Sequence, residues 1–404
     1  MNYTREENKW DKKISWGVAA YFFFHALLTT FRISTGIESR LPSFLSGALI
    51  IGFLLIGIRE VIRRSSEILV ISYVIGIAVY TISFLMAISR QEQITPILRW
   101  SAFPTFVWWI PVGVWAYSVK SSEVLYNCLL KISIPISFLW YMTLFSSGAS
   151  LVGDDPEHSY DMMLGIGLLF PCLFHLNEFS HSRRVLWLII GVIEAITIFL
   201  YGNRGPLICL FVFILYRFMF TGNNLFIKII VAATLLLLMV YQDVFIQHLV
   251  TLLDSKSINS RTLNLLVNGS INDTSGRDAL WAKCFDMIKE RPILGWGIGG
   301  ETTELSFRMG HSASHSFSAH NGLIQNWLHF GVVLGSFVSL LFIIPFFRPF
   351  KFKNDKCLQG LIIILMSYYA SRFISSSGFF VDPEISVFFY LFYCRKTNPN
   401  LQMI

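Results

Sequence analysis

One long polar passage interrupts a chain that otherwise consists of apolar runs. Residues 275–321 read SGRDALWAKCFDMIKERPILGWGIGGETTELSFRMGHSASHSFSAHN. The passage holds an arginine at a predicted helix start, a proline that ends this helix, a glycine-rich loop and three histidines, and it leads into another apolar run. We therefore look for chemistry here, and we expect the rest of the chain to hold this passage in place.

The composition indicates a membrane protein. Of the 404 residues, 54% are hydrophobic and only 14% are charged, whereas soluble domains carry about 25% charged residues. The apolar runs have lengths near the roughly 20 residues of a spanning helix, which excludes a barrel of short alternating strands. We predict an all-α, polytopic membrane protein that forms one membrane domain over residues 1–404.

Cysteines and charge point to no other class. All cysteines except Cys284 lie in or beside apolar runs, so no disulfide framework is expected. The net charge of +7 comes from basic residues in short loops, which membrane orientation explains without nucleic acid. No small-residue cleavage site follows the first apolar run, so we interpret it as a retained helix.

The hydrophobic pattern predicts about twelve spanning helices. An even number puts both termini on one side of the membrane, and lysine and arginine concentrate in the loops of that side, so both termini are expected in the cytoplasm. The long loop 247–320 then faces the periplasm or the outside. The predicted spans are 14–31, 44–58, 68–88, 94–117, 124–146, 161–177, 185–201, 205–220, 225–246, 321–347, 357–376 and 384–394.

A helix is expected within this loop. Ser275 and Asp278 form a capping-box pattern at its start, and Pro292 should end it near Glu290. Three- and four-residue spacing then gives one apolar face. That face comprises Leu280, Trp281, Cys284, Phe285 and Ile288.

The glycines of GWGIGG match a dinucleotide-binding pattern at Gly295, Gly297 and Gly300. They follow a helix and a proline rather than a strand, so we interpret them as a tight loop packed against helix ends. His311, His315 and His320 could supply metal ligands, but no cysteine or well-spaced carboxylate completes a set, and we expect no metal.

Two arginines stand at predicted helix starts outside the cytoplasm. Arg204 lies in the turn GNRGP, and Arg277 opens the loop helix. A guanidinium there is electrostatically unfavourable unless an anion binds, because backbone N–H groups and the arginine would both point at it. The alternative is an arginine that reaches the membrane surface or forms an exposed ion pair.

Charged residues within spans are costly and indicate function by default. Lys131 and Glu194 lie near mid-membrane and could pair, and Arg372 lies toward the outer end of its span. Gly331 and Gly335 form a weak GxxxG helix-packing signal.

The second half of the chain resembles the O-antigen ligase and polymerase superfamily of bacterial surface-polysaccharide enzymes. The resemblance is carried by GNRGP, by SGRDALWAKCFDMIKERPILGWGIGGE and by SAHNGLIQNWLHFGVVLGSF, in that order. It implies a GT-C-like membrane glycosyltransferase that acts on an undecaprenyl-diphosphate-linked oligosaccharide on the outer face of the inner membrane, without nucleotide sugar, metal or cofactor.

The resemblance also implies roles for individual residues. Arg204 and Arg277 would hold the diphosphate and stabilise it as leaving group. His320, neutral near pH 7, would take the proton from the acceptor hydroxyl. Asn321, Arg291 and Arg372 are further candidates for substrate binding. Membrane lipid and a chain-length regulator are candidate partners.

Three functions remain open at this stage. The pattern looks more like a polymerase of O-antigen or capsular repeat units, and the alternative in the same superfamily is a ligase that transfers the chain to lipid A core. A flippase or transporter of lipid-linked glycans belongs to another class. Such transporters usually show internal repeats and short loops, and neither is evident in this sequence.

Overall fold

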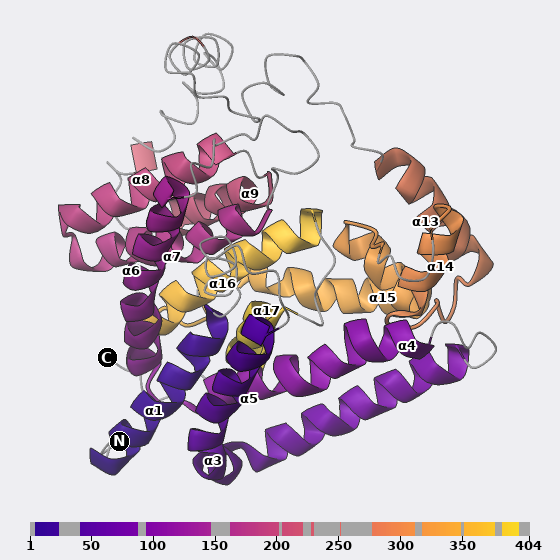
Figure 1. Cartoon of the computed structure of the whole chain (residues 1–404), viewed down its shortest axis with the longest axis horizontal. Coiled ribbons are helices and arrows are strands. Elements are labelled where there is room, and N and C mark those ends of the chain that lie inside the picture. The colour runs from indigo at the N-terminus through magenta and orange to yellow at the C-terminus, as the bar shows by residue number, and fades with distance from the viewer. Residues whose placement is uncertain are drawn as a thin grey trace. The chain divides into compact units, whose positions relative to one another are not determined.

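The structure is a computed structural model. It describes residues 5–23, 41–87, 94–146, 162–201, 204–220, 228–229, 251, 277–311, 317–348, 351–375 and 382–395. Every described secondary-structure element is helical (Figure 1). The chain divides into two compact units. Unit 1 comprises Met1–Ile56, Ser121–Asp273 and Asp355–Ser367, and unit 2 comprises Gly57–Lys120, Thr274–Asn354 and Tyr368–Ile404.

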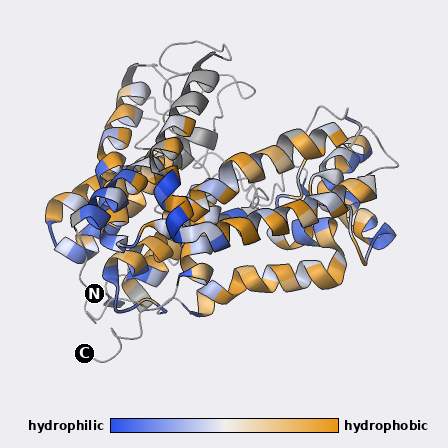
Figure 2. Ribbon diagram, turned by 90° about the horizontal axis from the view of Figure 1, so that it is seen from below, coloured by the Kyte–Doolittle hydropathy of each residue, from blue (hydrophilic) through white to orange (hydrophobic). Residues whose placement is uncertain are grey.

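Four described helices are long and apolar enough to cross a membrane. They are Gly57–Leu85, Ser122–Thr143, Gly322–Phe347 and Lys356–Ile374. Apolar residues dominate them (Figure 2), and large apolar side chains remain exposed, as for Val70 at 60% and Phe138 at 63%. Exposed apolar faces of this extent fit contact with lipid. The structure confirms an all-helical protein with apolar helices, and the number of twelve spans stays a prediction.

Several predicted spans differ from the structure or cannot be compared with it. Much of 14–31 and nearly all of 225–246 lie outside the described residues. The predicted spans 44–58 and 68–88 form one helix, α3 (Leu41–Ala87), which is kinked at Ser65. Glu60 accepts hydrogen bonds from Arg63 and Arg64, both at 2.6 Å, just before the kink. The charged residues that we expected in a loop therefore lie on a bent helix.

Unit 1 is a helical bundle around α7 (Met162–Ser182). α6 (Ser122–Ser146), α8 (Val185–Tyr201) and α9 (Arg204–Ile214) pack against α7, and α1 (Arg5–Phe22) packs against α6 (Figure 1). The ring of Phe22 meets that of Phe170 edge-on at 4.5 Å. Such aromatic contacts supply much of the packing between these apolar helices.

The charged residue inside α8 has a partner that we did not expect. Glu194 accepts hydrogen bonds from His175 Nδ1 at 2.8 Å and from Ser137 Oγ at 2.5 Å, and it is fully buried. Lys131 is exposed on α6. The expected pairing of Lys131 with Glu194 is therefore wrong: residue spacing locates charges on helices, but it does not reveal which helix faces turn toward each other.

Unit 2 begins with the part of α3 that follows Gly57. After it come α4 (Ile94–Pro96), two π-helical segments (Ile97–Ala102 and Thr105–Trp109) and α5 (Ile110–Ser118). α17 (Pro383–Phe389), with a π-helical extension Tyr390–Cys394, packs against α5. Gly113 permits this contact, because a Cβ there would collide with Tyr390 and Ser386. α16 (Lys356–Ser375) enters unit 2 at Tyr368.

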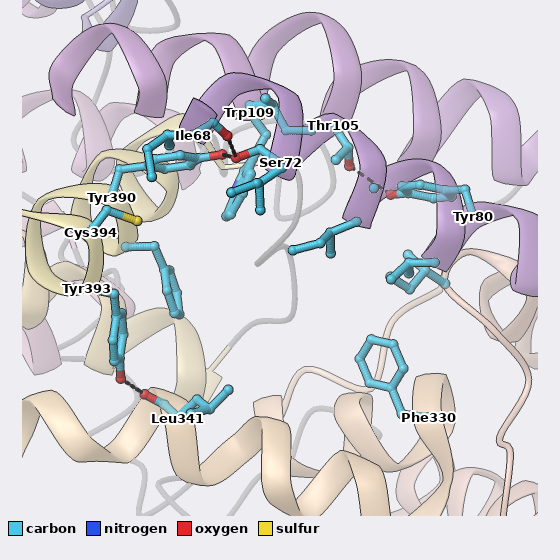
Figure 3. A pocket seen from close by; sticks show the side chains of 17 residues that line it. Ile68, Ser72, Tyr80, Thr105, Trp109, Phe330, Leu341, Tyr390, Tyr393 and Cys394 are labelled. Carbon is cyan, nitrogen blue, oxygen red and sulfur yellow. Dashed lines mark hydrogen bonds between the residues drawn. The ribbon is translucent and has the colours of Figure 1, made fainter. Parts of the chain in front are cut away.

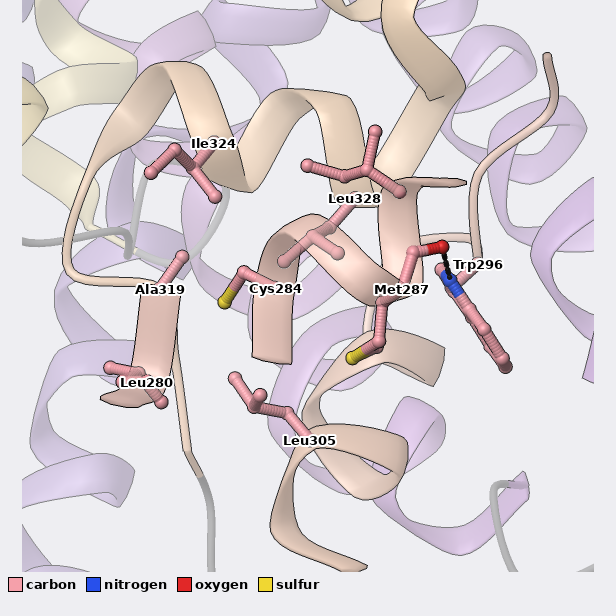
Figure 4. Packing of buried hydrophobic residues seen from close by; sticks show 9 residues of the cluster. Leu280, Cys284, Met287, Trp296, Leu305, Ala319, Ile324 and Leu328 are labelled. Carbon is pink, nitrogen blue, oxygen red and sulfur yellow. Dashed lines mark hydrogen bonds between the residues drawn. The ribbon is translucent and has the colours of Figure 1, made fainter. Parts of the chain in front are cut away.

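The polar passage folds as two helices joined by the glycine loop. α13 (Arg277–Glu290) confirms the predicted loop helix, and α14 (Gly300–Arg308) was not predicted. Figure 4 shows their shared apolar cluster with the start of α15 (Gly322–Phe347). Met287 is buried there, whereas Phe285 is exposed, so the expected apolar face was wrong at Phe285. Ser275 lies outside the described residues.

The predicted span 321–347 is not one continuous helix. Gly331 has φ 75° and ψ 175°, which breaks α15 into residues 322–330 and 332–347. Asn326 donates to Ser339 Oγ at 3.0 Å, and Trp327 donates to Ser336 Oγ at 2.9 Å. In a straight helix, residues 13 positions apart would be about 20 Å apart, so the chain folds back at Gly331. The GxxxG pattern therefore marks a sharp bend.

Candidate active site around His320

His320 lies at the junction between the polar passage and α15. It has φ 50°, one of two positive values among the described non-glycine residues. Such backbone conformations cost on the order of 1–3 kcal/mol and occur often at functional sites. Asn321 follows as the N-cap of α15, and its Oδ1 accepts from the backbone N–H groups of Leu323 and Ile324 at 3.0 and 3.1 Å. The first turn of α15 is thereby fixed directly after His320.

The peptide groups before His320 are held by side chains from two helices. Trp281 Nε1 of α13 donates to the Ala319 carbonyl at 2.8 Å. Gln325 Oε1 of α15 accepts from the Ala319 N–H at 3.0 Å. Ala319 is completely buried. Both backbone polar groups of the residue before His320 are thus satisfied inside the unit.

A buried polar network continues from Gln325. Its Nε2 donates to Glu301 Oε1 at 2.7 Å, and His329 Nε2 lies 2.9 Å from the same oxygen. Thr302 Oγ1 also donates to it at 2.9 Å. Burial alone would raise the pKa of Glu301, but the charge and hydrogen bond of His329 and the bond from Thr302 hold it below its ordinary value. Glu301 is therefore a buried carboxylate that accepts several hydrogen bonds.

Burial and the charges of two arginines act on the His320 ring. Burial, the charge of Arg277 and the charge of Arg372 each lower the pKa of His320 below its ordinary value of 6.5. The half-buried ring is therefore neutral at pH 7, which is the form that accepts a proton. Three of the predicted site residues, Arg277, His320 and Arg372, thus lie close enough to interact electrostatically.

The remaining candidates have identifiable partners. Arg372 Nε donates to Asp382 Oδ2 at 2.6 Å, which fixes its guanidinium group. Arg291 stacks on the Trp296 ring, 4.1 Å from the ring centre. Arg204 is the first residue of α9 in unit 1, and its side chain lies outside the described part of the chain.

The other two histidines that could supply metal ligands are His311 and His315. His311 is exposed and lies against Phe317, with 4.9 Å between the ring centres. His315 lies outside the described residues. Among the residues that the structure describes, no three His, Cys, Asp or Glu side chains form a metal-binding group.

The glycine loop packs against the break in α15. Gly295, Gly297 and Gly299 have φ values of 68°, 79° and 87°. Trp296 N and Gly297 N donate to the carbonyls of Leu328 and His329 at 2.7 and 3.1 Å, and Val332 N donates to Pro292 O at 2.7 Å. These bonds satisfy backbone groups that the break in α15 releases. The loop thus holds the bend, as its interpretation as a tight packing loop predicted.

An apolar cavity of about 390 Å³ lies within unit 2 (Figure 3). α3, α5, the π-helical segment Thr105–Trp109, α15, and α17 with its π-helical extension line it. Tyr80 and Thr105 share a hydrogen bond of 2.7 Å on its wall, and Tyr390 donates to Ser72 at 2.6 Å. The polar groups of these residues are thereby satisfied, which leaves apolar surface toward the cavity. Its size lies within the range of roughly 300–1,000 Å³ that is usual for ligand pockets.

Comparison with known families agrees with the sequence resemblance. Residues 186–339 match the O-antigen ligase family, Wzy_C. The match covers less than half of the chain, from α8 into α15, and it includes Arg204, Arg277, Arg291, His320 and Asn321. Wzy_C enzymes transfer lipid-linked glycans in surface-polysaccharide biosynthesis. A comparison with curated proteins finds no match.

Sequence reasoning missed Glu301, Gln325 and His329. Glu301 follows the glycine loop without a recognisable motif, and Gln325 and His329 stand in a run that we interpreted as a spanning helix. Their four-residue spacing places both on one face of a helix. This spacing was the signal that could have identified them.

Proposed function

We propose that this protein is a polymerase of O-antigen or capsular repeat units. It transfers a growing glycan from polyprenyl diphosphate to a sugar hydroxyl of the next lipid-linked unit, on the outer face of the bacterial inner membrane. The observation that carries the proposal is the match of residues 186–339 to the O-antigen ligase family, a range that contains Arg277 and the half-buried His320. A base next to cationic groups suits a reaction in which a hydroxyl attacks and a diphosphate leaves.

The reaction requires one proton transfer and the displacement of the diphosphate at the anomeric carbon of the donor glycan. The acceptor hydroxyl oxygen forms a bond to the anomeric carbon of the donor glycan, and His320 takes the hydroxyl proton. The bond from this carbon to the diphosphate oxygen breaks, and polyprenyl diphosphate leaves with the electron pair. Arg204 and Arg277 neutralise the charge that develops on the diphosphate, since guanidinium groups offer two parallel hydrogen bonds to phosphate oxygens.

The apolar cavity supports the lipid part of the proposal. A polyprenyl chain needs an apolar surface within the protein or at its lipid boundary. The cavity of about 390 Å³ offers one in unit 2, which also contains His320 and Arg277. Ile71 and Phe330 are among its apolar lining residues. We propose that the first isoprene units of the donor occupy it.

Substitution of His320 tests the mechanism. His320→Ala should lower kcat by roughly a hundred- to ten-thousandfold, which is the usual contribution of positioned proton transfer. The protein should still fold and bind polyprenyl diphosphate. The assay measures polymer formation by purified protein, supplied with lipid-linked repeat units extracted from a strain that lacks the gene. A variant with near-normal kcat would refute the role of His320 as base.

Substitution of the arginines tests the diphosphate site. Arg204→Lys and Arg277→Lys keep the charge but lose the bidentate hydrogen bonding to phosphate oxygens. Each should cost on the order of 3 kcal/mol, or about a hundredfold in rate. Normal chain length with either variant, at matched expression, would remove that arginine from the site.

The surface glycan of the deletion strain separates polymerase from ligase. A lost polymerase leaves a single repeat unit on the lipid A core. A lost ligase leaves bare core and an accumulated lipid-linked polymer, and this outcome would favour the alternative of chain transfer to lipid A core. A normal glycan pattern would contradict both.

A further inference from the structure

We propose that Trp281 and Gln325 are positioning residues for His320, and that Glu301 holds the Gln325 amide in its working orientation. This inference rests on the proposed function, in which His320 is the base. It assigns a catalytic purpose to a buried network in unit 2 that the sequence motifs do not contain.

The first step is the position of Ala319. Its carbonyl belongs to the peptide group that joins it to His320, so the hydrogen bond from Trp281 fixes the plane of that group. The bond from the Ala319 N–H to Gln325 fixes the preceding peptide group. Because His320 itself has the unfavourable φ of 50°, its backbone needs such restraint on the preceding side.

The second step is the orientation of the Gln325 amide. A backbone N–H can only donate, so the oxygen of the Gln325 side chain must face Ala319. Its NH₂ group must then face Glu301 Oε1, which accepts at 2.7 Å, and His329 Nε2, which lies 2.8 Å away. A reversed amide would set its NH₂ group against the Ala319 N–H and its oxygen against the Glu301 carboxylate. The carboxylate therefore selects one of the two amide orientations.

The third step is the burial of this contact. Glu301 and Gln325 are each 2% exposed, so water does not compete for the hydrogen bond between them. A bond to an ionised acceptor is roughly twice as strong as a neutral one. Oε2 of Glu301 is also buried and has no hydrogen-bonding partner among the described residues. The Glu301 carboxylate is thus removed from water. Its Oε1 lies at the point where the side chains of Gln325, His329 and Thr302 meet.

The fourth step is the rigidity of the frame. Trp281 lies on α13, Glu301 on α14 and Gln325 on α15. All three helices contribute to the apolar cluster that contains Ala319 (Figure 4). A catalytic group must be held to within about 0.5 Å, and a displacement of 1 Å can cost on the order of a hundredfold in rate. The network supplies this precision.

A pair of tryptophan variants tests the contact to the carbonyl. Trp281→Phe removes the N–H that holds Ala319, and Trp296→Phe removes a similar bond to Met287 O, at 2.9 Å, in the same cluster. Per folded molecule, Trp281→Phe should lower kcat on the order of tenfold with little change in KM. Trp296→Phe should leave kcat near normal. Equal effects of the two variants on kcat would refute a positioning role for Trp281.

A reversal of the amide–carboxylate pair tests the second contact. Gln325→Glu sets two carboxylates against each other, and kcat should fall by roughly a hundredfold at pH 8, with partial recovery at lower pH as they share a proton. In the Glu301→Gln/Gln325→Glu double variant, the new amide donates to the new carboxylate, which still accepts from Ala319. Recovery of kcat to within about threefold of the wild type is expected. A double variant no faster than Gln325→Glu alone would refute the inference.

His320→Ala in the same assay separates the two proposals. If His320→Ala is inactive while Trp281→Phe and Gln325→Glu keep normal kcat, the positioning network is refuted and the base assignment stands. If His320→Ala keeps normal activity, the base assignment fails, and the positioning role fails with it.

Discussion

Each unit buries a histidine against a carboxylate, and the two pairs differ in where their hydrogen bonds lead. In unit 1, His175 Nδ1 bonds to Glu194 at 2.8 Å, and its Nε2 lies 3.3 Å from Ser133 Oγ, which donates to Leu130 O. In unit 2, the contact of His329 with Glu301 continues through Gln325 to the residue before His320. The first network ends at a backbone carbonyl of α6, and the second ends at the residue that precedes the candidate base.

The hydrogen-bonding partners of His175 distinguish the two pairs further. The Ser133 hydroxyl, which donates to Leu130 O at 2.7 Å, lies against His175 Nε2, and the Glu194 carboxylate lies against His175 Nδ1. Every side-chain polar atom of this pair has a partner. We infer that the unit 1 pair serves stability, whereas the unit 2 pair serves the site.

The largest effect is expected from a variant that breaks the unit 1 pair of His175 and Glu194. Glu194→Ala removes the buried partner of both His175 and Ser137, and each buried polar group left unsatisfied costs about 1–3 kcal/mol, so the protein should lose about 3–5 kcal/mol of stability. Thermal unfolding in detergent and the yield of folded protein measure this loss. The folded fraction should keep its activity.

Two further variants sharpen this prediction. Glu67→Ala removes an exposed carboxylate and should change stability by less than about 0.5 kcal/mol. Joint replacement of His175 and Glu194 by leucine should recover much of the stability, because apolar groups need no partner. Normal folding of Glu194→Ala with reduced kcat would mean that the unit 1 pair is functional and the comparison is wrong.

The next effect concerns the bend that brings His329 to Glu301. Gly331→Ala places a Cβ against Ile293 O at a φ of 75°, whereas Gly310→Ala has φ 80° and no atom within 4 Å. Both variants carry the backbone cost of about 1–2 kcal/mol. Gly331→Ala should lose about 1–3 kcal/mol more from overpacking, and kcat should fall with it. Equal stabilities in thermal unfolding would show that the bend tolerates a side chain.

The smallest effect is a shift in pH dependence. Activity should fall as pH drops below the lowered pKa of His320, because the protonated ring cannot act as a base. Arg372→Gln removes one positive charge and frees the Asp382 carboxylate, and both changes raise this pKa. The acidic limb of the kcat profile should therefore move to higher pH. Arg372→Lys keeps the charge and serves as control. An unmoved limb in Arg372→Gln would place Arg372 outside the site.

The membrane class, the loop helix and the tight glycine loop could be predicted, because each depends on a local pattern in the sequence. These patterns are apolar runs, capping and proline signals, and glycines that suit positive φ. The partner of Glu194 and the bend at Gly331 could not, since both depend on which helix faces meet. Gly331 stands in a run whose hydropathy suits an unbroken span, whereas its backbone angles and the bonds across the bend show the break.

The roles of the candidate site residues stay predictions, and the sequence pointed to only some of the residues that the structure brings forward. Motif order pointed to Arg277 and His320, and the charges of Arg277 and Arg372 both lower the pKa of His320. Glu301 and Gln325 carry no motif. Their importance follows from burial and from hydrogen bonds between residues 24 positions apart, which a linear pattern does not contain.

The bend at Gly331 also bears on the thickness of the membrane. Residues 332–347 rise about 24 Å as a helix, whereas a typical hydrocarbon core is about 30 Å thick. A helix this short is matched by a thinner bilayer, or by local compression of the lipid around it, at a cost of fractions of a kcal/mol per Å. Hydrophobic mismatch would thereby couple the lipid composition of the membrane to the helix 332–347, which follows directly on the segment that bears His329.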